Sequence, residues 1–196
     1  VSWENFDRAS MDVVEEANCY ANIYRNMSGL DPDFSKGLRD RMDEYLQTVI
    51  KEEWPLLGKG QRSPHTQRLT RGIWAFFGSY EPKSEREKIF YASILSQMDE
   101  AGKYRRQRVL DAQTGIHPML WGILLIGGAV TIFFACFLGS ENLGAQLIMT
   151  NLLALLIGLQ LLTILMLDYP FSGDVRIEPH VFEEVIRYIA PINLPD

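Results

Sequence analysis

The sequence is poor in the residues on which metal sites and disulfide frameworks depend. It contains only two cysteines and three histidines in 196 residues. Cys19 lies in a charged segment and Cys136 in an apolar run, which argues against a structural disulfide between them. No histidine stands three residues after a carboxylate, the spacing at which a helix presents both groups to one metal ion. We therefore expect no metal and no other cofactor.

Catalytic constellations are also missing. Gly58-Lys59-Gly60 lacks the rest of a phosphate-binding loop, and no glycine-rich dinucleotide motif follows a strand. Glutamates occur as adjacent pairs, but neighbouring side chains diverge around a helix and cannot act together as acid and base. We interpret these pairs as solvated faces and expect that the protein is not an enzyme. The pairs are Glu15-Glu16, Glu52-Glu53 and Glu183-Glu184.

An excess of positive charge is missing as well. The formal net charge is -6 and the sequence pI is about 5.1. This balance argues against nucleic acid as a partner. The basic residues between Lys103 and Arg108 form a local cluster that can still contact anionic lipid headgroups.

Residues 1–117 show no sustained alternation of apolar and polar side chains, so we expect essentially no sheet. Apolar residues recur instead every three or four positions, the period of one helical face. Three capping signals mark helix starts, namely Asp31-Pro32, Ser63-Pro64, and Ser84 with Glu87 three residues later. Long amphipathic helices joined by short loops predict an antiparallel bundle and an all-α fold.

Proline and glycine predict where these helices end. Pro55 is expected to stop the second helix near Trp54, and the fourth is expected to break at Gly102 or Gly115 as it approaches the membrane. Near the C-terminus, Pro179 predicts the start of a short amphipathic helix.

Two uncharged apolar runs dominate the second half, at 118–138 and 143–167, separated by Gly139-Ser140-Glu141-Asn142. Each is long enough as a helix to cross a hydrocarbon core of about 30 Å, and the chain is too short to bury two such helices in a soluble core. The short connection makes them an antiparallel hairpin in the lipid bilayer. Lysines and arginines flank the hairpin on one side, which predicts that both flanking segments are on the cytoplasmic-equivalent side.

The hairpin carries small residues at every fourth position, which lets helix backbones approach closely. We interpret these residues as packing surfaces. They are Gly127, Thr131, Ala135 and Gly139 in the first run, and Thr150, Ala154 and Gly158 in the second. Gln146, Asn151 and Gln160 are polar at membrane depth, where interhelical hydrogen bonding is favoured over the alternative of lining a polar pathway.

Asp168 lies where the second run leaves the membrane, ahead of a turn-rich segment containing Pro170, Phe171 and Gly173. Both ends of the hairpin meet at this face, so we expect Asp168 either to cap a helix or to pair with an arginine, in preference to coordinating an ion. The candidate arginines are Arg105, Arg106 and Arg108.

Several ordered motifs resemble those of the bestrophin-like membrane proteins of unknown function. They cover nearly the whole chain in the family's order, around a similar hydrophobic hairpin. The motifs are Val14-Glu15-Glu16-Ala17-Asn18, Glu53-Trp54-Pro55, Arg105-Arg106-Gln107-Arg108, Gly115-Ile116-His117-Pro118-Met119-Leu120-Trp121 and Leu167-Asp168-Tyr169-Pro170-Phe171-Ser172-Gly173.

The resemblance implies a membrane protein with a domain at 1–117, a transmembrane hairpin at 118–168 and a C-terminal segment at 169–196. It implies further membrane helices upstream of Val1, in a bacterial inner membrane or an organelle membrane. Bestrophins proper are similar in layout and form pentameric anion channels, which favours a homo-oligomeric anion channel or transport-related protein by analogy of fold. The alternative is a non-catalytic accessory subunit of a larger membrane complex.

Overall fold

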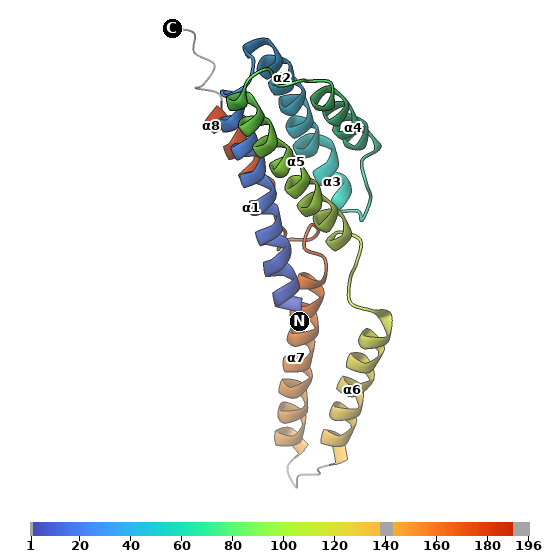
Figure 1. Ribbon diagram of the computed structural model, residues 1–196. Helices are drawn as coiled ribbons and strands as arrows, with labels where there is room; N and C mark the ends of the chain where they lie inside the picture. Colours follow the sequence, from blue (N-terminus) through green and yellow to red (C-terminus); the bar gives the residue numbers. More distant parts are fainter. Residues whose placement is uncertain (1, 138–142, 190–196) are drawn as a thin grey trace.

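The computed structural model describes residues 2–137 and 143–189, and within these ranges every regular element is helical. Figure 1 shows a bundle of helices standing above a long two-helix hairpin. The all-α prediction is therefore confirmed. In chain order the elements are α1 (Ser2–Met27), α2 (Pro32–Thr48), the π-helical turn η1 (Val49–Glu53), α3 (Trp54–Leu57), α4 (Pro64–Gly78), α5 (Glu85–Asp111), α6 (Pro118–Phe137), α7 (Leu143–Asp168) and α8 (His180–Ile189).

The three predicted capping residues start α2, α4 and α5. Asp31 accepts hydrogen bonds from the amides of Asp33 and Phe34, which satisfies two donors of the first turn of α2. Ser63 caps α4 in the same way.

The start of α5 differs from the expected capping box, in which the carboxylate of Glu87 would accept from the amide of Ser84. Ser84 accepts from the amide of Glu87, but the carboxylate of Glu87 returns to the amide of Lys83, at 2.9 Å, and not to that of Ser84. The same carboxylate accepts from the hydroxyl of Tyr80, which ties the α4–α5 connection to the start of the helix.

The helix end predicted at Pro55 is wrong, and of the two positions expected for the break of the fourth helix, only Gly115 lies in one, between α5 and α6. The chain stays helical through Pro55, because η1 inserts a wider turn in which the Trp54 amide bonds to Val49, and the proline falls in the first turn of α3, where no amide donor is needed. Gly102 does not break α5, which continues to Asp111. A side chain at Gly102 would meet only the flexible end of Arg106, so nothing in the packing forces a bend there.

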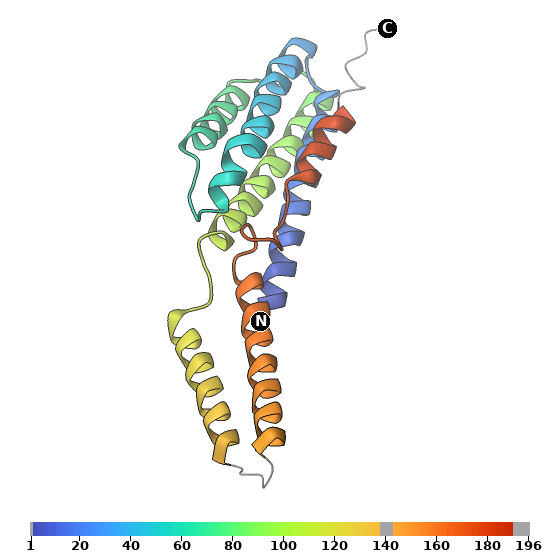
Figure 2. The same ribbon diagram turned by 180° about the vertical axis from the view of Figure 1, so that it is seen from behind.

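The hydrophobic core of the bundle is shared by segments from both ends of the chain. Helices α1 and α5 pack along each other, and α8 lies against α1 on the side seen in Figure 2. Phe182 of α8 is fully buried, and its ring centre lies 5.4 Å from that of Trp54. The segment that follows the hairpin thus completes the core of the segment that precedes it.

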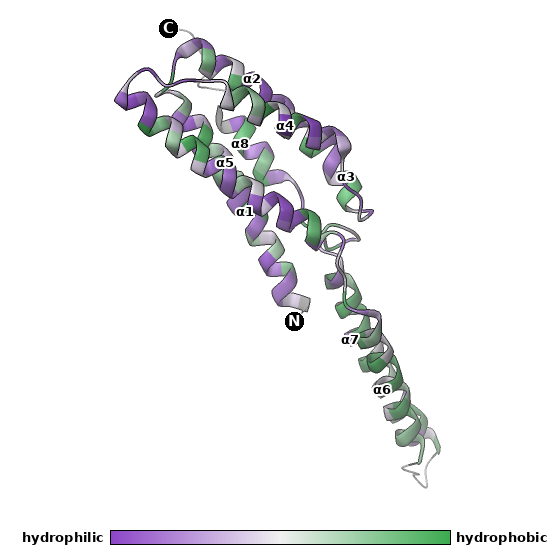
Figure 3. Cartoon of the chain, turned by 45° about the vertical axis from the view of Figure 1, so that its right-hand side comes forward, coloured by the Kyte–Doolittle hydropathy of each residue, from purple (hydrophilic) through white to green (hydrophobic). Residues whose placement is uncertain are grey.

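The hairpin has a different surface from the bundle. Figure 3 shows apolar residues covering α6 and α7, while apolar and polar residues alternate around the bundle helices. Helices α6 and α7 run side by side and contact each other, and the N-terminal end of α1 contacts α7.

Candidate functional site

Helices α6 and α7 have the length and composition of membrane spans. They contain 20 and 26 residues, and their most apolar windows have mean hydropathies of 2.3 and 2.2, with no residue of either window buried. At about 1.5 Å per residue, each helix reaches the thickness of a hydrocarbon core. Large apolar side chains such as Phe133, Phe137 and Leu147 are exposed along the hairpin. Such a surface is stable only against lipid or other apolar helices.

Gly128 faces the other hairpin helix at short distance, and the predicted stripe does not include it. A Cβ atom at Gly128 would lie 3.1 Å from Cγ2 of Ile157, whereas one at Gly127 or Gly158 would have no neighbour within 4 Å. The side chain of Gln146 donates to the carbonyl of Ala135 at 2.9 Å, as expected for interhelical hydrogen bonding.

The predicted small-residue stripes therefore do not form the contact between α6 and α7 as a whole. Ala135, Thr150 and Ala154 are partly covered, Gly127, Thr131 and Gly158 are exposed, and Gly139 lies outside the described residues. The physical reason is the helical pitch. A step of four residues overshoots one turn by about 40°, so a stripe of several steps winds away from a single partner.

Asn151 and Gln160 remain on the outer surface of α7. Both are exposed, and within residues 2–137 and 143–189 neither side chain forms a hydrogen bond. The hairpin by itself therefore leaves two amide groups without partners at membrane depth.

Asp168 joins the two ends of the hairpin through the chain that enters α6. Its carboxylate accepts from the backbone amide of Ile116 and lies 3.4 Å from the indole Nε1 of Trp121. A Cβ atom at Gly115 would stand 3.1 Å from the same carboxylate and from the hydroxyl of Tyr169, so only glycine fits without displacement. Asp168 thus accepts a backbone amide of the connection ahead of α6, which differs from the expected helix cap.

The predicted pairing of Asp168 with an arginine is wrong. Arg105 and Arg108 bind Glu53 and Glu16 inside the bundle, and Arg106 is exposed on α5. Because α5 ends at Asp111 and residues 112–117 connect it to α6, these arginines lie in the last turns of α5, before the connection whose Ile116 amide donates to Asp168.

The residues after Asp168 turn the chain back into the bundle. Phe171 is buried with its ring centre 5.8 Å from that of Trp54, and the carbonyl of Pro170 accepts from the amide of Ile177 at 2.8 Å. Gly173 has a φ of 79°, a conformation that a residue with a side chain rarely adopts. These three residues therefore lie in the turn that leads from α7 back into the bundle.

A cluster of charged side chains occupies the centre of the bundle. Arg108 is fully buried and binds Glu16 through two hydrogen bonds, of 2.7 and 3.1 Å, and Glu53 through a third of 3.0 Å. Arg105 binds the other oxygen of Glu53 at 2.7 Å, and Thr66 donates to the same oxygen. The cluster joins α1, η1, α4 and α5 and contains equal numbers of positive and negative charges.

Aromatic residues close the cluster on two sides. The hydroxyl of Tyr20 contacts Glu16 and Tyr45, at 3.2 and 3.0 Å. The guanidinium carbon of Arg108 lies 4.9 Å from the ring centre of Trp54, within the range of a cation–π contact. The indole Nε1 of Trp54 donates to the carbonyl of Ile177, which ties the cluster to the segment after the hairpin.

The pKa values of the two carboxylates of the cluster are shifted in opposite directions. Burial raises the pKa of Glu16 above its ordinary value, more than the attraction of Arg108 lowers it. Burial also acts to raise the pKa of Glu53, but the attraction of Arg108 and Arg105, together with its hydrogen bonds, holds it below the ordinary value. Arg108, which is near both carboxylates, has a raised pKa and stays charged.

The interpretation of the glutamate pairs as solvated faces is wrong for Glu16 and for Glu53, each of which is one member of a pair. Glu16 and Glu53 are fully buried, while their neighbours Glu15 and Glu52 are exposed. Neighbouring residues diverge by about 100° around a helix, so one member of a pair faces the core while the other faces solvent. A usable signal exists in the sequence, because Glu16 lies three residues after Val13 and four before Tyr20, on the buried face of α1.

A comparison with family models decides the classification. The model of the bestrophin-like domain matches residues 1–182. The chain belongs to the bestrophin-like family. No curated protein and no solved structure was found to match it.

The match spans the bundle, both hairpin helices and the junction, so the bestrophin-like domain includes all three parts described above. The family resemblance expected from the sequence motifs is confirmed. With the two apolar helices, it identifies a membrane protein of the bestrophin type.

Proposed function

We propose that this protein is an oligomeric membrane protein that conducts or transports anions. The observation that carries the proposal is the exposed side-chain amide of Asn151 on α7, which has no hydrogen-bond partner within the described residues. An amide that faces hydrocarbon without a partner costs several kcal/mol. A neighbouring membrane helix or a water-filled path therefore receives it in the assembled protein.

The position of Asn151 favours a helix–helix contact. Gly144, Asn151 and Gly158 recur every seven residues, and seven residues are close to two full turns of a helix. The three residues consequently lie along one line of α7, which combines close backbone approach with one hydrogen-bonding group. At Asn151 and Gly158 this line is exposed, which favours a contact there with a helix of another subunit or of an upstream segment.

Anion permeation is proposed from the similarity in layout to bestrophins proper, which form anion channels from several subunits. The basic residues between Lys103 and Arg108 and the arginines after the hairpin support a cytoplasmic-equivalent position for the bundle and the C-terminal segment. Together these features describe a membrane assembly with a large helical domain on the inner side.

Two measurements test the proposal on the full-length protein. The mass of the detergent-solubilised particle, with bound detergent subtracted, should be a multiple of the subunit mass. Liposomes that contain the protein should release chloride faster than empty liposomes in a dye assay. A monomer, or liposomes as tight as empty ones, would contradict the proposal.

The variant Asn151→Leu tests the contact itself. It should shift the particle toward smaller assemblies, because the line on α7 loses its hydrogen-bonding group. Met149→Leu is the matched control, since Met149 is exposed on α7 away from this line and already apolar. Equal masses for both variants would mean that Asn151 does not face a partner helix.

The second candidate is an accessory subunit of a larger membrane complex. It is favoured by Trp3 and Met11, two exposed apolar residues on α1, a helix that contacts the membrane hairpin. This candidate predicts that the protein purifies from native membranes with a different polypeptide in fixed ratio and forms no symmetric oligomer alone.

A further inference from the structure

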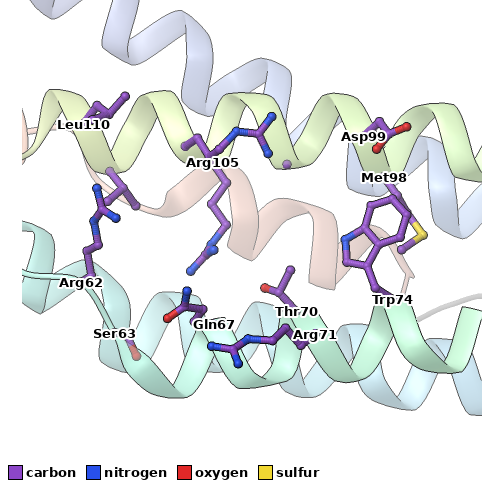
Figure 4. A pocket seen from close by; sticks show the side chains of 13 residues that line it. Arg62, Ser63, Gln67, Thr70, Arg71, Trp74, Met98, Asp99, Arg105 and Leu110 are labelled. Carbon is purple, nitrogen blue, oxygen red and sulfur yellow. The ribbon is translucent and has the colours of Figure 1, made fainter.

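A cavity lies between α4 and α5, apart from the membrane hairpin. Its volume is about 430 Å³, within the usual range for small-molecule sites. Figure 4 shows Arg105 crossing from α5 toward Gln67 on α4, with Trp74 and Met98 at the other end of the space. Exposed residues such as Arg71 and Arg106 belong to its wall, so a solute can reach it from water.

The charge of the cavity is positive. Four arginines line it, and Asp99 is its one acidic residue. Arg105 is neutralised by Glu53, but Arg62, Arg71 and Arg106 form no ion pair within the described part of the chain. Three uncompensated guanidinium groups around one space favour a ligand that brings negative charge.

Arg105 is held in place before any ligand arrives. Its Nη2 atom bonds to Glu53 and to Thr66, at 2.7 and 3.1 Å, while its buried Nε atom has no acceptor. A buried donor without an acceptor costs free energy, and an oxygen of a bound anion would satisfy it. The fixed position of the side chain also reduces the entropy lost on binding.

The opposite end of the cavity is apolar. Trp74 is partly buried and Met98 nearly fully buried, and both line the space. An aromatic ring or an acyl group placed there would gain burial and stacking contacts that a bare inorganic ion cannot make. The cavity thus has an anionic and an apolar subsite next to each other.

We propose that this cavity binds a small organic phosphate, with the phosphate among Arg71, Arg105 and Arg106 and the organic part against Trp74. The phosphate group of a lipid and that of a soluble nucleotide share this chemistry. The proposal is separate from ion conduction, because binding can be measured whether or not the protein conducts.

Binding is tested on the full-length protein in nanodiscs with three probes: adenosine monophosphate, a short-chain phosphatidic acid and inorganic phosphate. At least one organic phosphate should bind saturably in calorimetry, at least tenfold more tightly than inorganic phosphate. Tighter binding of the nucleotide would identify a soluble ligand, and tighter binding of phosphatidic acid a lipid headgroup. No saturable binding of either organic probe, or equal affinity for all three, would overturn the proposal.

Two variants test the location. Arg71→Gln with Arg106→Gln should weaken binding at least tenfold, and the fold should persist because both side chains are exposed and form no ion pair. Arg68→Gln with Arg86→Gln is the matched control, with one exposed arginine changed on each of the same two helices, outside this cavity. If the two double variants weaken ligand binding equally, the ligand does not bind in the cavity between α4 and α5.

A third variant changes shape without changing charge. Gly102 lines the cavity, and a side chain there would meet only Nη1 of Arg106, at 3.4 Å from the Cβ position. Gly102→Leu should therefore fill part of the space, favour the helix and weaken binding at least tenfold. Unchanged affinity in Gly102→Leu would show that the ligand binds elsewhere.

Discussion

The bundle and the hairpin place their polar groups in opposite ways. The bundle encloses Glu16, Glu53 and Arg108 at full burial and pairs them with one another. The hairpin has apolar side chains on its outside, and the amide of Asn151 there has no hydrogen-bond partner among residues 2–137 and 143–189. The bundle therefore pairs its buried glutamates and arginines with one another, whereas the apolar surface of the hairpin suits lipid.

This difference predicts that the replacement of one buried charged residue in the bundle lowers the free energy of unfolding more than any single change in the hairpin. Arg108→Leu would leave two buried carboxylates without their shared partner, which should cost about 3–5 kcal/mol of unfolding free energy. Denaturant unfolding followed by circular dichroism in detergent measures this loss. Arg86→Leu, on the exposed start of the same helix, is the control and should change little. An equally large loss of unfolding free energy in Arg86→Leu would show that the effect of Arg108→Leu does not come from the buried cluster.

The next prediction concerns pH. The pKa of Glu53 is lower in the folded protein than its ordinary value of 4.5, so its stabilising effect is present above that value and is lost as the pH falls through the folded pKa. Glu53→Gln should be less stable at neutral pH by about 3 kcal/mol, and should lose less further stability on acidification.

The contribution of Glu16 to stability changes with pH in the opposite direction. Burial raises its pKa, so its contribution is greatest below 4.5 and declines as the pH rises through the folded pKa. Glu16→Gln should therefore make the fall in stability on acidification steeper than in the unchanged protein at pH values above 4.5, up to the folded pKa. Melting temperatures from pH 3 to 8 test both variants, and parallel curves for the two would contradict the assigned directions.

The junction between the two regions should be less sensitive. Asp168→Asn keeps the shape of the side chain but removes the charge that accepts from the Ile116 amide, so we expect a loss of about 1–3 kcal/mol and faster hydrogen exchange at residues 112–117. Asp174→Asn, in an exposed part of the same C-terminal segment, is the matched control. Unchanged exchange at the connection would refute the structural role of Asp168.

The smallest effect is expected within the hairpin. Gly128→Leu would press against Ile157 and should cost about 1 kcal/mol, at the low end for overpacking, because α6 can move away into lipid. The neighbouring change Gly127→Leu has open space and should cost less. Thermal unfolding in detergent compares the two. A larger loss for Gly127→Leu would indicate that the free face of α6 is covered by a partner.

Local signals were sufficient to predict most helix boundaries. Capping by Asp31, Ser63 and Ser84 depends on atoms within three residues along the chain, and such local contacts can be predicted from the sequence. The continuation past Pro55 was not predicted, because the π-helical turn that accommodates it depends on packing around Trp54. The family could be recognised because its motifs follow one another in order along the chain.

The buried cluster could not be predicted in the same way. Arg108 is separated from Glu16 by 92 residues and from Glu53 by 55, so no local spacing relates them. The sequence contains several other glutamates and arginines, and a formal charge does not distinguish an exposed partner from a buried one. The cavity between α4 and α5 was missed for a similar reason, because it exists only where two helices stand apart.

The sequence by itself determined that this chain is helical, that residues 118–138 and 143–167 suit a bilayer, and that the protein is of the bestrophin type, since hydropathy and helical period are properties of consecutive residues. Tertiary structure decided which charges are buried, that Asp168 accepts from Ile116, and that Gly128 faces Ile157 across the hairpin. These features depend on how the helices are rotated and spaced against one another, and that geometry results from packing across the whole molecule.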